Sequence, residues 1–283
     1  MPYILLIIYL LLSLFLQIFA GNFPTYIMAF PLNLLCATLF YWAMLMLWCR
    51  RRQSTFVRFM LSPQATFIAL FLLIDACAVI GLTGEMDMTI SWPFIAVLLY
   101  FQTVLIFVLL RGLREVLPTG AQTGPIRWRF ILNHAGLLLA LAAGFWGAPD
   151  SRNLRLRAYE GEPVTQALLQ GSGPVGIGHE IELKKFTIER FDNGTPSLYE
   201  AELLIDGIEA NIRVNHPYRL GFGKNLYLTG YNLDSDKGRA CCIMQMVIEP
   251  WKPWALAGIL MMLSGAFLLF TQGPRKKKSS AIL

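Results

Sequence analysis

Residues 130–150 read FILNHAGLLLALAAGFWGAPD, where an apolar segment ends and a polar region of about 100 residues begins. The apolar part, 130–148, approaches the roughly 20 residues that a helix needs to cross a bilayer. His134 lies inside it, although an ionisable side chain is costly in hydrocarbon. The stretch therefore predicts a membrane helix leading to an outer domain, and it raises the question of what His134 does.

The composition favours a membrane protein. The chain has 283 residues, 55% of them hydrophobic, with a mean hydropathy of +0.52 and 15% charged residues. A soluble domain carries about 25% charged residues. Five further apolar segments lie at about 3–21, 26–49, 64–83, 92–111 and 253–271. The first lacks the basic start and the small-residue cleavage site of a signal peptide. We therefore expect a polytopic α-helical membrane protein with six spans.

Basic residues between the spans predict the orientation. They cluster in 50–63, in 111–129 and in the tail at 275–278, whereas the short loop 84–91 carries two acidic residues. Six alternating spans place all three basic clusters on one side, which the positive-inside rule identifies as cytoplasmic. Both termini are then on the cytoplasmic side of the membrane. The pI of about 9.1 reflects this orientation and not nucleic-acid binding.

Residues 149–250 lie between the fifth and sixth spans and are predicted to be extracytoplasmic. They hold 11 basic and 14 acidic residues, and their apolar residues alternate as in strands. The glycine-rich stretch 170–178 lacks a Gly-Lys-Ser/Thr sequence, so we expect a plain loop there. The predicted strands are 180–191, 198–205, 208–215, 225–232 and 241–249. We therefore expect a membrane domain (1–148), an extracytoplasmic antiparallel β domain (149–250), and a sixth span with a basic tail (251–283).

Common catalytic motifs are missing from the sequence. It has no Cys-x-x-Cys, no Cys-x-x-Cys-His, no Gly-x-Ser-x-Gly and no His-Glu-x-x-His. Cys241 and Cys242 are neighbours in a predicted strand, so their side chains point to opposite faces and are poor disulfide partners. We expect no catalytic residues, which argues against a self-contained hydrolase or thiol oxidoreductase.

His134 allows two interpretations. It lies five residues after Arg129, about 7–8 Å inside the cytoplasmic edge of its helix. On a helical wheel it shares an apolar face with Leu138, Leu141 and Phe145, and a ridge of small residues lies roughly opposite, at Gly136, Ala140 and Gly144. This setting suits a flat apolar cofactor whose metal binds a neutral imidazole. It equally suits a histidine that is hydrogen-bonded to a neighbouring helix.

Other polar residues lie inside the predicted spans. Asp75 is close to the bilayer middle, either as a protonated acid bonded to a neighbour or as a relay residue. Gln17, Asn33 and Gln102 are expected to form hydrogen bonds between helices.

Several stretches resemble the ResB family. FMLSPQATFIALFLLIDACAVIGLTG (59–84), SWPFIAVLLYFQTVLIFVLLRGLR (91–114) and the Asn-His-x-Gly-Leu helix at 130–150 resemble its first three helices. IELKKFTIERFDNGTPSLYEAELLI (181–205) and IRVNHPYRLGFGKNLYLTGYN (212–232) resemble its β domain, and WALAGILMMLSGAFLLF (254–270) its closing helix. The extra pair of helices at 3–49, with YIMAFPLNLL, resembles the Bacteroidetes-type version.

The resemblance implies a role in system II cytochrome c maturation. ResB-like (CcsB) proteins work with CcsA to move haem outward, and the complex joins the haem vinyl groups to the Cys-x-x-Cys-His cysteines of an exported apocytochrome c. The resemblance therefore implies haem b within the membrane, with His134 as a candidate axial ligand of the iron. His216, in a Val-Asn-His-Pro loop, is either a turn residue or close to the exit site.

The implied partner is a separate CcsA-like, tryptophan-rich membrane protein. The Trp-Asp segment that CcsA uses to present haem has no counterpart here, where the tryptophans occur singly. The chain thus resembles one half of a complex, which leaves open whether it is an enzyme by itself. The alternative is a structural or sensory membrane protein whose outer domain binds a ligand or subunit without any cofactor.

Overall fold

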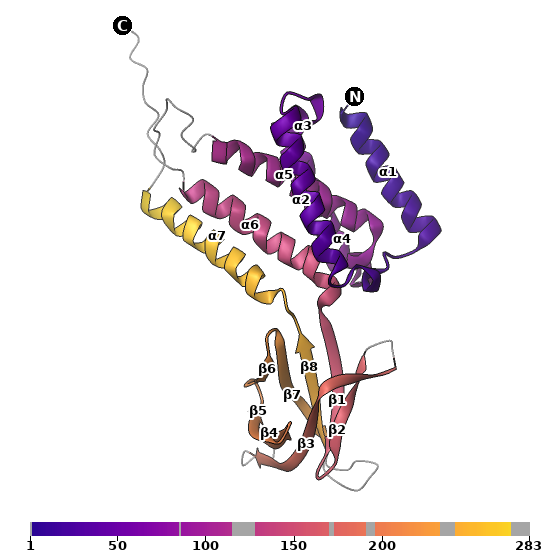
Figure 1. The fold of residues 1–283 in the computed structure, drawn as a ribbon, viewed down its shortest axis with the longest axis vertical. Coiled ribbons are helices and arrows are strands. Elements are labelled where there is room, and N and C mark those ends of the chain that lie inside the picture. The colour runs from indigo at the N-terminus through magenta and orange to yellow at the C-terminus, as the bar shows by residue number, and fades with distance from the viewer. Residues whose placement is uncertain are drawn as a thin grey trace. The chain divides into compact units, whose positions relative to one another are not determined.

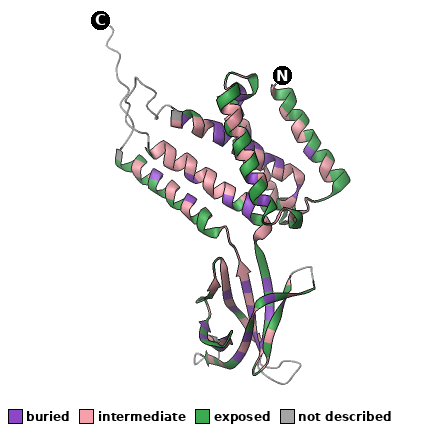
Figure 2. Ribbon diagram, viewed as in Figure 1, coloured by how far each residue is buried: buried purple, intermediate pink, exposed green. Residues whose placement is uncertain are grey.

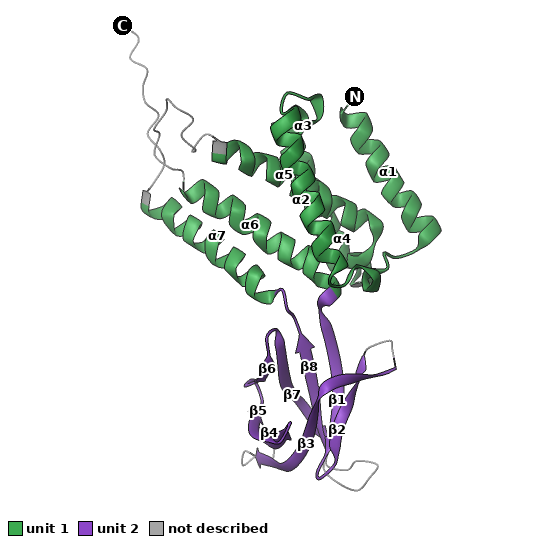
Figure 3. Cartoon of the chain, viewed as in Figure 1, with its two compact units in different colours: residues 1–149, 252–283 green, residues 150–251 purple. Residues whose placement is uncertain are grey.

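The computed structural model describes residues 2–84, 86–114, 128–169, 173–190, 196–232 and 241–272. The chain divides into two compact units (Figure 3). The first, the helical unit, comprises Met1–Pro149 with Lys252–Leu283, and the second, the sheet unit, comprises Asp150–Trp251.

Six described helices of the helical unit are long and apolar enough to cross a membrane (Figure 1). They are α1 (Pro2–Ala20), α2 (Leu32–Arg51), α4 (Pro63–Thr83), α5 (Trp92–Arg114), α6 (Trp128–Gly147) and α7 (Lys252–Gln272). Short helices lie between them: α3 (Thr55–Met60) and the 3-10 helices η1 (Thr25–Met28), η2 (Met86–Ile90) and η3 (Ala148–Asp150). The apolar helices thus occur where the sequence predicts them.

Two details of the helical unit differ from the prediction. The second apolar helix begins at Leu32 and not at residue 26, because Pro31 has no backbone N–H and breaks the segment into η1 and α2. The basic loop after α2 contains the unpredicted helix α3, whose first turn is capped by the Ser54 hydroxyl accepting from the Val57 N–H.

Helix α5 forms the centre of the helical unit. Its residues Tyr100, Phe101, Val104 and Phe107 are buried against α3 and α4. Many large apolar residues of α1, α2, α4 and α7 are instead exposed, and Figure 2 shows the exposed residues of α1 and α7 in green. A surface this apolar is the one that a bilayer requires.

Close backbone contact holds α6 against α7. A Cβ atom added at Gly136 of α6 would lie 2.6 Å from the Gly258 carbonyl oxygen, and one added at Gly258 would lie 2.6 Å from the Ala140 nitrogen. Gly136 and Ala140 therefore form the predicted small-residue contact. Gly144 does not belong to it, because a Cβ there would meet nothing within 4 Å.

The sheet unit is one antiparallel sheet with the strand order β5-β4-β3-β2-β1-β8-β7-β6. Strand β5 also contacts β6 and β7, so the sheet curls around a core of leucine, isoleucine and methionine side chains. The strands are β1 (Arg152–Tyr159), β2 (Pro163–Leu169), β3 (Pro174–Arg190), β4 (Pro196–Ile205), β5 (Ile208–Arg213), β6 (Tyr218–Gly221), β7 (Lys224–Asn232) and β8 (Cys241–Ile248).

Three of these strands, β1, β2 and β6, lie outside the strands predicted from the sequence. The expected loop at 170–178 is also wrong in part, because β3 begins at Pro174, while residues 170–172 lie outside the described residues. Strand β3 continues through this glycine-rich stretch because its residues 174–176 pair with Gln166, Ala167 and Leu168 of β2.

The two ends of the sheet unit lie side by side. Strands β1 and β8 are neighbours, with Arg152 opposite Ile248, and the Trp251 indole N–H donates to the Asp150 carboxylate at 2.6 Å. The chain therefore enters and leaves this unit at one point.

Candidate functional site

His134 is half-buried on α6, one turn after Phe130. Its Nδ1 lies 2.9 Å from the Phe130 carbonyl oxygen. Because a carbonyl oxygen only accepts, Nδ1 must carry the hydrogen, and Nε2 of the neutral ring keeps its lone pair. Histidines that bind metals commonly hold their other ring nitrogen in this way. The hydrogen bond therefore leaves Nε2 as the ring nitrogen that a ligand role would use.

An aromatic stack fixes the plane of this ring. The Phe130 and His134 rings are stacked, with centroids 4.0 Å apart and an interplanar angle of 29°. The Phe130 ring in turn lies against Gly112 of α5, in the space that a Cβ atom there would occupy. Two arginines, Arg111 and Arg129, are the sequence neighbours of this contact and add positive charge at the same end of α5 and α6.

The apolar face beside His134 is not continuous. Leu138 and Leu141 are partly buried against the core formed by α3, α4 and α5. Phe145 lines an apolar cavity of about 380 Å³, together with Leu141, Phe94 and Trp146. The chain's own core therefore covers part of the apolar face that the sequence predicted for a flat cofactor. Only the end of this face nearest His134 is left for such a cofactor.

The polar residues Gln17, Asn33 and Gln102 form the predicted bonds between helices. The Asn33 amide donates to the Trp146 carbonyl at 2.8 Å, and Gln102 accepts from the Tyr41 hydroxyl at 2.7 Å. Gln17 accepts from the Trp92 backbone N–H at 2.9 Å.

Both cysteines of β8 are free and buried. Cys242 belongs to the core of the sheet unit, and burial raises the pKa of its thiol to about 12, with smaller contributions from Cys241 and Glu160. A thiol that stays protonated is a poor nucleophile, so Cys242 acts in packing.

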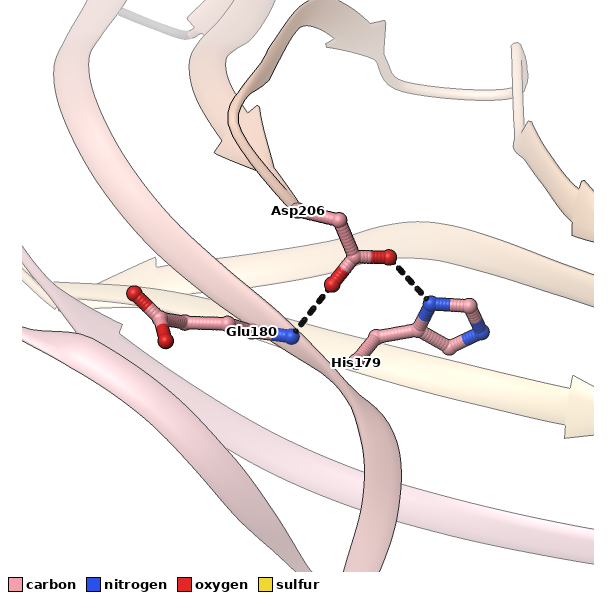
Figure 4. A network of polar contacts seen from close by, with 3 residues as sticks. All are labelled: His179, Glu180 and Asp206. Atoms are coloured by element: carbon pink, nitrogen blue, oxygen red, sulfur yellow. Dashed lines mark hydrogen bonds and ion pairs between the residues drawn. The ribbon is translucent and has the colours of Figure 1, made fainter.

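One polar network of the sheet unit is absent from the site residues predicted from the sequence. His179 Nδ1 lies 2.6 Å from Asp206 Oδ2, and the Glu180 backbone N–H donates to Asp206 Oδ1 at 2.8 Å (Figure 4). These two hydrogen bonds lower the pKa of Asp206, and the bond from His179 has the larger effect. Asp206 and Gly207 have positive φ angles and form the tight turn between β4 and β5, which the Asp-Gly pair does signal. The network therefore ties this turn to β3.

His216 lies in a turn. Its backbone N–H donates to the Arg213 carbonyl at 3.0 Å, and the preceding Asn215 has a φ of 62°. The imidazole is exposed. Within the described ranges, no group of three or more His, Cys, Asp or Glu side chains is arranged to hold a metal ion. A haem iron held from one side needs only one such ligand.

The comparisons with known proteins relate part of the chain to one family. Residues 121–244, which include His134 and most of the sheet unit, match the ResB-like family. That match leaves out residues 3–49, on which the Bacteroidetes-type resemblance rests. The comparison with curated proteins gives no match. Among solved structures the chain is similar to "Cytochrome c Heme Lyase CcmF", with 13% identity and a TM-score of 0.39. That similarity covers 90% of this chain but only 43% of the other.

Proposed function

We propose that the chain is a ResB-like component of a cytochrome c maturation complex in the bacterial cytoplasmic membrane. The observation that carries this proposal is the family match over residues 121–244 together with the hydrogen bond that leaves Nε2 of His134 available. In this proposal α1, α2, α4, α5, α6 and α7 span the membrane, both termini are cytoplasmic, and the sheet unit is extracytoplasmic.

Haem b is the proposed cargo, and His134 is its ligand from this chain. The Phe130 carbonyl holds Nδ1–H, and the Phe130 ring limits rotation of the imidazole, so Nε2 is pre-oriented. The arginines at 111 and 129 place positive charge at this end of the helices, which complements the two propionates of haem. His134 would hold the iron through Nε2, and the positive charge of Arg111 and Arg129 would attract the carboxylate edge of the cargo.

A partner must complete the site. Leu138 and Leu141 are already packed into the chain's own core, so this chain supplies one wall only. The second axial ligand and the facing wall come from a CcsA-like membrane protein in this proposal. The sheet unit then takes part in receiving apocytochrome c, and attachment of haem belongs to the complex.

The test is haem content after purification together with a CcsA-like partner. We expect the Soret absorbance per mole of complex to fall at least about tenfold in His134→Ala, because one axial bond is lost while alanine maintains the helix. His216→Ala is the matched control, since that imidazole lies in an exposed turn. Imidazole added to the medium should restore part of the absorbance in His134→Ala.

Unchanged haem content in His134→Ala, at normal membrane abundance, would remove His134 from the site. A colourless wild-type complex would remove the haem proposal itself, and it would favour a structural or sensory protein without a cofactor.

A further inference from the structure

Helix α4 carries a carboxylate near its middle. Asp75 is twelve residues beyond Pro63 in a helix of 21 residues. At 1.5 Å per residue this places it about 18 Å along a helix about 31 Å long. If α4 spans the bilayer, Asp75 lies close to the centre of the hydrocarbon.

The carboxylate faces away from the chain's own packing. The inner side of α4 is marked by Ala65 and Ala69, which are buried against α5, and the Tyr100 hydroxyl donates to the Ala65 carbonyl at 3.2 Å. Asp75 is exposed, and its side chain forms no hydrogen bond or ion pair with any residue that the structure describes. The described part of the chain therefore supplies no partner for this carboxyl group.

Three other exposed residues share a face of α4 with Asp75. Phe71, Asp75, Ala78 and Leu82 follow one another at intervals of four, three and four residues, the spacing of a helix–helix contact. Phe71 is 68% exposed and Leu82 is 88% exposed. The small Ala78 beside the acid allows another helix to approach closely. We call these four residues the α4 seam.

We propose that the α4 seam is the docking surface for a transmembrane helix of another membrane protein that carries an arginine or lysine at the same depth. Ionisable groups inside a membrane commonly face protein or water and pair with one another, because an unpaired charge in lipid is costly. A basic partner supplies the opposite charge. A second copy of this chain would instead bring two carboxylates together, which opposes association. The inference stands whether or not His134 binds haem.

The experiment measures energy transfer between the labelled full-length protein and synthetic transmembrane peptides in phosphatidylcholine vesicles. Three polyleucine peptides are compared, with a central arginine, a central leucine or a central glutamate. We expect the arginine peptide to bind wild-type protein at least about tenfold more tightly than the other two. Asp75→Leu should abolish the preference and Asp75→Asn should reduce it. Asp87→Asn, an equivalent change in η2 outside the span, should leave it unchanged.

Three results would overturn the proposal. The first is equal binding of the three peptides to wild-type protein, which does not depend on whether any variant folds. The second is a full arginine preference in Asp75→Leu. The third is disulfide cross-linking between copies of the Ala78→Cys variant that the added arginine peptide does not reduce. This result would make the α4 seam a contact between identical chains.

Discussion

Replacing Gly136 by alanine should separate α6 from α7. The added methyl carbon would lie 2.6 Å from the Gly258 carbonyl oxygen and 2.9 Å from the Met262 nitrogen, whereas ordinary contact begins at 3.4 Å. These neighbours are backbone atoms and cannot rotate away, so the helices must move apart by up to about 0.8 Å. A gap of this size loses roughly a quarter to a half of the dispersion energy of each contact.

The expected cost follows from two opposing terms. Overpacking of this kind destabilises by about 1–3 kcal/mol, and the better helix propensity of alanine offsets up to about 1 kcal/mol. With the full offset, we expect Gly136→Ala to lower the free energy of unfolding by up to about 2 kcal/mol. Gly144→Ala is the matched control on the same helix. Because no atom lies within 4 Å of its Cβ position, that variant should be neutral or slightly stabilised.

The assay is reversible unfolding of the full-length protein in mixed micelles of dodecyl maltoside and SDS, followed by far-ultraviolet circular dichroism. The midpoint SDS fraction should fall in Gly136→Ala and stay or rise in Gly144→Ala. Equal midpoints for the two variants would refute the close α6–α7 contact as the reason for glycine at 136.

The other predictions concern the orientation and the sheet unit. In a cysteine-free background, a membrane-impermeant maleimide added to intact cells should label Glu209→Cys and not Gln53→Cys; the reverse pattern would contradict the proposed orientation. Cys242 should resist iodoacetamide at pH 8 in folded protein, as judged by mass spectrometry, because its pKa is about 12 and it is buried; rapid modification would show an exposed thiolate. The pKa of Asp206 is lower in the folded chain, so the stability it contributes is complete above its unfolded pKa of about 3.9 and is lost as the pH falls through the folded value. Asp206→Asn should therefore reduce the hydrogen-exchange protection of the Glu180 amide at pH 6. The difference from the wild-type protein should be smaller near pH 3, and the Asn-Gly pair should maintain the turn. Equal protection in the two proteins at pH 6 would show that the carboxylate contributes nothing.

The sequence predicted the helices better than the strands for a physical reason. An apolar run of about 20 residues is a strong signal, whereas a strand of four to eight residues is defined by its neighbours. Strand β6 is only four residues long and pairs with β7. Strand β1 did carry a signal, since Leu154, Leu156 and Ala158 alternate with exposed residues.

The candidate site was predictable only in part. The sequence shows that His134 lies in an apolar helix, and the i−4 spacing to Phe130 is visible there. The contact of Phe130 with Gly112 joins positions 18 residues apart on two helices, and no local pattern encodes it. The covering of Leu138 and Leu141 by α3, α4 and α5 likewise depends on the packing of the helices.

Because its two ends meet, the sheet unit has the geometry of a domain inserted between α6 and α7. Since Arg152 and Ile248 face each other across one antiparallel pair, their Cα atoms are only about 5 Å apart. A few glycines would bridge that distance, so we expect that residues 153–247 can be removed or exchanged while the ends of α6 and α7 keep their spacing. We therefore expect insertions and deletions within the sheet unit to leave the packing of the helices unchanged.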